Sequence, residues 1–268
     1  MLVVLAVTHV AVAQPASPEP LTIGDTFTLE SEILGETRRI NVYAPAAYTA
    51  SDTLRLPVLY MPDGGTGEDF VHVAGLVQIG ALNGTMQPHL LVGIENAERR
   101  RDLTGPTDDP RDREIAPRVG GSAAFRAFLG DELRPVIDAQ YRTTGETAIV
   151  GESLAGLFVV ETLLLEPDLF DTYIAIDPSL WWNRGQLAAE AASLLASAPA
   201  AERTLYLAGS GQPQLGAAAH SLYADLDAAA VPGLALHYRH HPGETHLSIY
   251  HPAALQAFRT VLGPASLD

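Results

Sequence analysis

The feature that most constrains the fold is an alternation of short apolar runs with longer amphipathic segments from residue 57 onward. The runs have the length of buried strands, and the segments between them have the apolar period of helices. Such alternation predicts βα units, which pack as a mostly parallel sheet with helices on both faces. The expected strands span 57–61, 90–94, 147–150, 173–176, 204–208 and 234–238, and the expected helices span 68–79, 122–141, 155–165, 184–196, 216–229 and 252–262.

Two further segments precede this alternation. Thr26–Ile33 and Arg38–Tyr43 alternate apolar and polar residues around the turn 34–36, which predicts an antiparallel hairpin. In the helix expected over 122–141, Ser122 is placed to cap the first turn and Pro135 to kink the axis. Residues 95–121 show no period and are rich in arginine and acidic residues, which is typical of a functional loop.

The first residues resemble a targeting segment. Leu2–Ala13 is a largely apolar run that ends in Ala-Val-Ala and precedes a polar, proline-rich stretch. This pattern is typical of a secretory signal peptide without its basic n-region, and the run is too short to span a bilayer as a helix. A buried strand is the alternative interpretation. We expect a signal peptide at 1–13, export to the periplasm or the medium, a linker at 14–25 and one catalytic domain over 26–268.

Charge and composition exclude several classes of partner. The chain carries 32 acidic residues against 16 basic ones, all arginine, for a formal net charge of −16. Such a surface repels nucleic acids and anionic membranes, so neither is expected as a partner. The absence of cysteine excludes disulfides, thiolate metal sites and a cysteine nucleophile.

Residues 147–160 carry the most informative motif. A β run ends at Val150, the turn Gly-Glu-Ser-Leu-Ala occupies 151–155, and an apolar helix follows at once. This is the strand–turn–helix context of a G-x-S-x-G nucleophile elbow, with alanine in the last position. It predicts Ser153 as a nucleophile and the amide of Leu154 as an oxyanion donor at a helix N-terminus. The alternative is a serine that only caps the helix, which would not require small residues on both sides.

A serine nucleophile needs a base, which in this class of elbow enzymes comes last in the chain. We predict His246 as the base, because it lies in the loop 242–248, where an imidazole can reach over the elbow. No recognised metal-ligand spacing is present, so neither a metal nor a cofactor is expected. Five histidines lie at this end of the chain: His237, His240, His241, His246 and His251.

Taken together, the chain resembles the putative-esterase family of α/β hydrolases, near the siderophore trilactone esterases and related bacterial carboxylesterases. The resemblance implies the α/β-hydrolase fold, Ser153 as nucleophile, His246 as base and a second oxyanion amide from the turn at Asp63-Gly64. It extends from Ser31 to Leu262. The segments that carry it are LGETRRINVYAP (34–45), LPVLYMPDGG (56–65), LLVGIENAERRRDLTGPT (90–107), FRAFLGDELRPVIDAQYRT (125–143), GESLAGLFVVETLLLEPDLFDTYIAIDPSLWWN (151–183) and PGETHLS (242–248).

The acid that would orient His246 is less constrained. Some relatives carry it just after the strand ending near Ala208, where this chain has Gly-Ser-Gly-Gln and no carboxylate. Asp177 is the first choice, since certain lipases place their acid after the strand that follows the elbow helix. Glu244, two residues before His246, is the alternative. The third possibility is a Ser-His dyad without an acid, which the resemblance to siderophore esterases of this family also allows.

Two residues are candidates for the substrate pocket. Trp181 follows Asp177 at the sheet edge where ligands bind in open α/β folds, although tryptophans are more often core residues. Arg101 lies in an arginine run, and relatives that cleave catecholate siderophores place an arginine near the scissile ester; a salt-bridged loop is the alternative. The expected function is hydrolysis of small-molecule carboxylic esters through an acyl-serine. The alternatives are acyl transfer by the same serine and a catalytically silent binding module.

Overall fold

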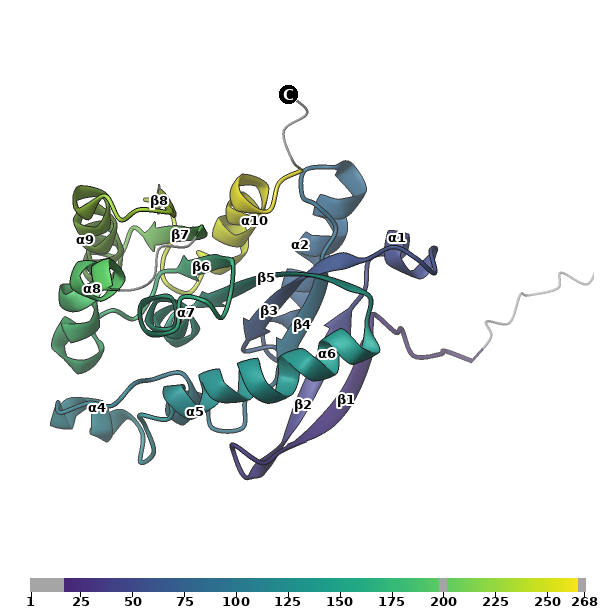
Figure 1. Ribbon diagram of the computed structural model, residues 1–268, viewed down its shortest axis with the longest axis horizontal. Coiled ribbons are helices and arrows are strands. Elements are labelled where there is room, and N and C mark those ends of the chain that lie inside the picture. Colours follow the sequence, from purple (N-terminus) through teal and green to yellow (C-terminus); the bar gives the residue numbers. More distant parts are fainter. Residues whose placement is uncertain (1–16, 198–201, 265–268) are drawn as a thin grey trace, which may run out of the picture.

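The computed structural model describes residues 17–197 and 202–264, and its centre is an eight-stranded sheet in the order β1-β2-β4-β3-β5-β6-β7-β8 (Figure 1). The hairpin β1–β2 is antiparallel, and β2 pairs antiparallel with β4. All other neighbours are parallel. The predicted mostly parallel sheet with an N-terminal hairpin is confirmed. The strands are β1 (Asp25–Ser31), β2 (Glu36–Tyr43), β3 (Leu56–Pro62), β4 (Leu90–Ile94), β5 (Thr143–Glu152), β6 (Thr172–Ile176), β7 (Arg203–Ser210) and β8 (Leu234–His241).

Helices cover both faces of this sheet, as predicted. α2 and α10 pack against each other over one face, whereas α7, α8 and α9 lie over the other (Figure 1). None of the helices in the described residues is both long and apolar enough to cross a membrane. The helices are α1 (Ala46–Thr49), α2 (Phe70–Asn83), α3 (Arg99–Asp102), α4 (Pro110–Ile115), α5 (Ser122–Ala127), α6 (Arg134–Gln140), α7 (Leu154–Leu165), α8 (Gln186–Ser197), α9 (Pro213–Ala229) and α10 (Tyr250–Val261).

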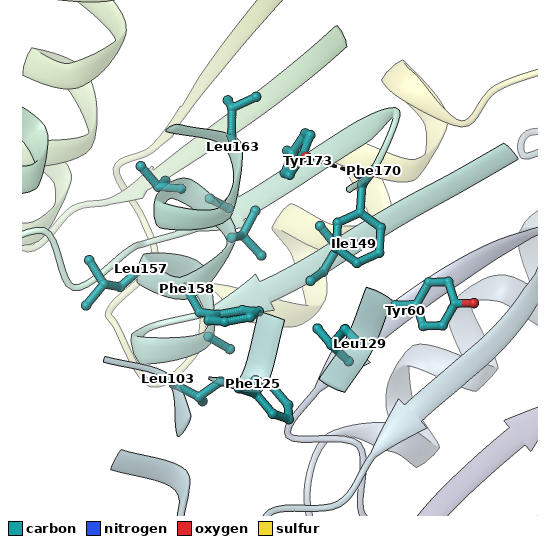
Figure 2. Packing of buried hydrophobic residues seen from close by; sticks show 14 of the residues in the cluster. Tyr60, Leu103, Phe125, Leu129, Ile149, Leu157, Phe158, Leu163, Phe170 and Tyr173 are labelled. Atoms are coloured by element: carbon teal, nitrogen blue, oxygen red, sulfur yellow. Dashed lines mark hydrogen bonds between the residues drawn. The ribbon is translucent and has the colours of Figure 1, made fainter. Parts of the chain in front are cut away.

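The central strands divide the core into two apolar layers. Every residue of β3 is buried, and its side chains alternate between the layers, with Leu59 in the one under α2 and α10 and Tyr60 in the other. α7 is buried from Leu154 to Leu164 because it is enclosed between the sheet and its neighbouring helices. In Figure 2, its Phe158 and Leu163 lie near Ile149 and Tyr173 of the sheet. This packing fixes the start of α7 at the carboxyl edge of the sheet.

The helical stretch from Ser122 differs from its prediction in two ways. Ser122 does not cap the helix, since Gly121 occupies the cap and the Ser122 hydroxyl donates to Glu161 at 2.6 Å. The buried carboxylate of Glu161 attracts this hydroxyl into the core. Before Pro135 the helix widens into a π-helical turn, 128–133, and then continues as α6. A wider turn accommodates the proline ring and its missing N–H.

The long stretch 95–121 folds into two short helices, α3 and α4, joined by loops. A fully buried ion pair between Arg38 and Asp102 attaches α3 to β2. The indole of Trp182 donates to the carbonyl of Gly105 at 2.9 Å, which anchors the loop between the two helices. Residues 17–24 contain neither helix nor strand, whereas the expected signal peptide lies outside the described residues.

Candidate active site

Ser153 lies on a sharp turn between β5 and α7. Its backbone has φ 60° and ψ −119°, a conformation that is rare for a residue with a side chain and is found mainly at functional sites. A Cβ added to Gly151 would come within 2.5 Å of the backbone of Ala155, so glycine is required for this close approach. Strand and helix therefore meet as the elbow motif predicts, with the serine at the apex.

The loop after β8 brings His246 to this serine. Nε2 of His246 lies 2.9 Å from Oγ of Ser153. On the other side of the ring, Nδ1 lies 2.8 Å from Oδ2 of Asp177. The three side chains form a continuous hydrogen-bonded chain from hydroxyl to carboxylate. An imidazole held in this way can accept the serine proton while its other nitrogen donates to the acid.

Asp177 is wholly buried just after β6, in a positive-φ conformation of 44°. The backbone amide of Ser210 donates to Oδ1 at 2.8 Å, and the Ser210 hydroxyl donates to Oδ2 at 2.9 Å. Burial opposes ionisation, but the bonds from His246 and Ser210 outweigh it and hold the pKa of Asp177 below its usual value. Ser210 is the last residue of β7, so it supports the acid from the neighbouring strand.

Asp177 in turn acts on His246. Its hydrogen bond is the main cause that raises the pKa of His246 above the usual value, against the opposing effect of burial. Glu244, the alternative acid, takes no part in this contact, since its carboxylate accepts from the Ser248 hydroxyl at 2.6 Å. The geometry thus favours Asp177 over both Glu244 and an acid-free dyad.

The two predicted oxyanion amides have different outcomes. Leu154 is the first residue of α7, and within the described residues its amide donates to no backbone or side-chain acceptor. The amide of Gly64 instead donates to the carbonyl of Ile94 at 2.9 Å, so it is engaged within the sheet in this structure. The cause is the pairing of β3 with β4, which continues into the turn. The next amide, that of Gly65, donates to the side chain of Glu68 at 2.7 Å.

Two residues of the arginine run, Arg101 and Arg99, bind different acidic partners. Arg101 donates to Glu36 at 2.6 Å and to Asp102 at 2.6 Å, which ties it to the hairpin rather than to the serine. These contacts fit the salt-bridged alternative, and the pocket role of Arg101 stays a prediction. Arg99 binds Asp63 through two hydrogen bonds of 2.7 and 2.8 Å and lies near the triad.

Trp181 and Trp182 separate into one surface and one core residue. Trp182 is buried, whereas Trp181 is 45 % exposed and lines a groove with Arg111 and Arg184. Ser179, two residues before Trp181 in the chain, has its hydroxyl 3.4 Å from Oγ of Ser153. Within the described residues, no group of three or more acidic or histidine side chains could hold a metal ion.

Glu152 is a residue of the site that the sequence analysis missed. It ends β5 directly before the nucleophile, and its Oε1 lies 3.2 Å from Nδ1 of His246. Burial is the main cause that raises its pKa to about 8. Glu152 lies inside the elbow motif, next to the nucleophile, and this position was the available signal in the sequence. The motif does not say where the side chain at this position is directed, because that depends on the geometry of the turn.

The family model of putative esterases matches residues 31–246. The chain belongs to this family. Across 169 residues it is 34 % identical to a ferri-bacillibactin esterase of Bacillus subtilis, covering 56 % of each chain. It is 32 % identical over 184 residues to a siderophore triacetylfusarinine C esterase of Aspergillus fumigatus, covering 62 % of this chain and 59 % of that one. The matched region thus spans less than two thirds of either relative.

A solved structure supports the same placement. The fold matches that of an IroE-like serine hydrolase from Shewanella oneidensis with a TM-score of 0.80 and 28 % identity. The match covers 89 % of this chain and 80 % of that protein. The predicted family resemblance and the α/β-hydrolase-type fold are therefore confirmed.

Proposed function

We propose that the protein is a serine esterase that hydrolyses carboxylic esters through an acyl-serine intermediate. The observation that carries this proposal is the hydrogen-bonded chain Ser153–His246–Asp177, with contacts of 2.9 and 2.8 Å. Membership of the putative-esterase family supports the same reaction class.

The reaction follows from these contacts. Oγ of Ser153 attacks the ester carbonyl while Nε2 of His246 takes its proton, and Asp177 stabilises the resulting imidazolium. The amide of Leu154 donates to the oxyanion of the tetrahedral intermediate. When this intermediate collapses, the ester C–O bond breaks and His246 returns the proton to the leaving alcohol. A water molecule then attacks the acyl-serine with the same base, which releases the carboxylic acid and restores Ser153.

We propose siderophore-type esters as the substrate class, because relatives that match this chain are named as esterases of ferri-bacillibactin and of the siderophore triacetylfusarinine C. The exposed ring of Trp181 would form an aromatic wall of the substrate site at the carboxyl edge of the sheet. The names of the relatives support the class of substrate, whereas the geometry of the triad supports the type of reaction.

The reaction class is tested with p-nitrophenyl acetate and butyrate, with and without an added alcohol acceptor. We expect release of p-nitrophenol and free carboxylic acid in equal amounts, and little acyl transfer to the alcohol. An acylated alcohol as the main product would indicate a transferase. A folded wild-type protein that turns over neither ester would contradict the esterase proposal.

We also propose export, since the apolar run 2–13 and the polar stretch after it have the pattern of a signal peptide. Expression of the full chain in a Gram-negative host should yield a periplasmic protein whose first residue is Gln14. A protein that stays in the cytoplasm with residues 1–13 intact would refute this proposal.

A further inference from the structure

Glu152 has a buried carboxylate oxygen that is not satisfied by hydrogen bonds. Its side chain is only 16 % exposed, and within the described residues Oε1 has no hydrogen-bond partner. Nδ1 of His246 is 3.2 Å away, but the N–H on that atom is directed to Asp177 at 2.8 Å. Buried polar atoms without a partner are rare in folded proteins, and they concentrate at functional sites.

The charges around Glu152 leave it without a cation of its own. Arg99, the arginine that acts on it, is held by both oxygens of Asp63. The His246 imidazole, which becomes positive when it is protonated, lies 3.2 Å from Oε1 of Glu152 and acts on it first among the nearby charges. The ionisable groups around it are His246 after β8, Asp177 after β6, Arg99 in α3, Asp63 and Asp69 in the turn after β3, and Tyr250 in α10.

We propose that Glu152 is a second acid for His246, a positioning residue whose ionised carboxylate stabilises the imidazolium formed when Ser153 attacks. The proposal rests on the esterase function proposed above. Asp177 holds the ring through its hydrogen bond, and Glu152 acts on the same nitrogen through charge at 3.2 Å. Because two carboxylates share one imidazole, the loss of Asp177 would leave a second acceptor at the correct nitrogen.

The pH dependence follows from the burial of Glu152. With a pKa of about 8, this carboxyl is mostly neutral at pH 7 and gains its charge as the pH rises past 8. The rate should therefore rise in two steps, first as His246 loses its proton and again as Glu152 ionises. An opposite charge at this distance changes a pKa by at least about one unit, so the second step should be about tenfold.

The test is the pH profile of kcat for p-nitrophenyl butyrate, corrected for spontaneous hydrolysis, in wild type and Glu152→Gln. The variant should keep the first step and lose the second, so that its kcat is near wild type at pH 6.5 and about tenfold lower at pH 9.5. Glu244→Gln is the matched control: it removes a carboxylate two residues from His246 that binds Ser248 instead, and it should keep both steps.

A second comparison covers the possibility that Glu152→Gln folds poorly. In an Asp177→Asn background, the pKa of Glu152 should fall because the charge of Asp177 raises it. The residual activity of that variant should then rise with pH, and adding Glu152→Gln should abolish the rise. Superimposable profiles with and without Glu152, in proteins with equal thermal stability, would overturn the proposal. Absence of turnover by the wild type would instead contradict the esterase function.

Discussion

Replacing Ser153 with alanine should lower kcat for p-nitrophenyl acetate by about a millionfold, the scale seen when the nucleophile of a serine hydrolase is removed. The loss is this large because the variant has no group at the elbow that can form the acyl intermediate. His246 keeps its contact with Asp177, so substrate binding and thermal stability should change little. The measurement is steady-state turnover with the residual rate compared with that of buffer alone.

The matched control is Ser179→Ala, which removes a hydroxyl 3.4 Å from that of Ser153 but leaves the elbow intact. We expect its kcat to stay within about tenfold of wild type, since one weak hydrogen bond contributes about 1 kcal/mol. Equal turnover by Ser153→Ala and wild type would exclude Ser153 as nucleophile. A millionfold loss of kcat in Ser179→Ala would show that Ser179, and not Ser153, is needed for the reaction.

Replacing Asp177 with asparagine should lower kcat by up to about 10⁴-fold, because asparagine can hold the ring in the wrong tautomer and carries no charge to stabilise the imidazolium. The pH profile of kcat gives an independent test of the role of Asp177. Asp177 raises the pKa of His246, and the base must be neutral to act, so wild-type activity falls as the pH drops through this raised value. In Asp177→Asn that acid limb should move to lower pH.

Glu244→Gln provides the comparison for this variant too, since Glu244 was the competing acid in the sequence and its carboxylate accepts from Ser248. Its kcat and acid limb should match those of wild type. If Glu244→Gln caused the large loss and Asp177→Asn did not, the assignment of the acid would be reversed.

The arrangement of the sheet was predictable because its signals are local. Burial on both faces makes strands such as β3 and β4 continuously apolar, and the strand–turn–helix pattern around Ser153 requires small residues that are visible in the sequence. His246 was also predictable, because the order of nucleophile and base along the chain limits the base to the last loops. Boundaries differed by a few residues, and β5 begins at Thr143 rather than Thr147.

The remaining features depend on contacts between distant segments. The choice between Arg99 and Arg101 depends on the face of α3 that meets the hairpin, where Glu36 binds Arg101. The amide of Gly64 is engaged by Ile94 of a neighbouring strand, which the sequence of the turn does not reveal. Likewise, the support of Asp177 by Ser210 joins β6 to β7 across 33 residues. Such contacts can be predicted only when the register of the strands in the folded sheet is known.

The most direct test of the triad is covalent capture of the nucleophile by diethyl p-nitrophenyl phosphate. Oγ of Ser153 should attack phosphorus and displace p-nitrophenolate, which leaves a stable diethyl phosphoserine. We predict one p-nitrophenolate released per chain, complete loss of esterase activity, and the added mass on the peptide that contains Ser153. A modified residue other than Ser153, or full esterase activity in a protein modified at Ser153, would contradict the account.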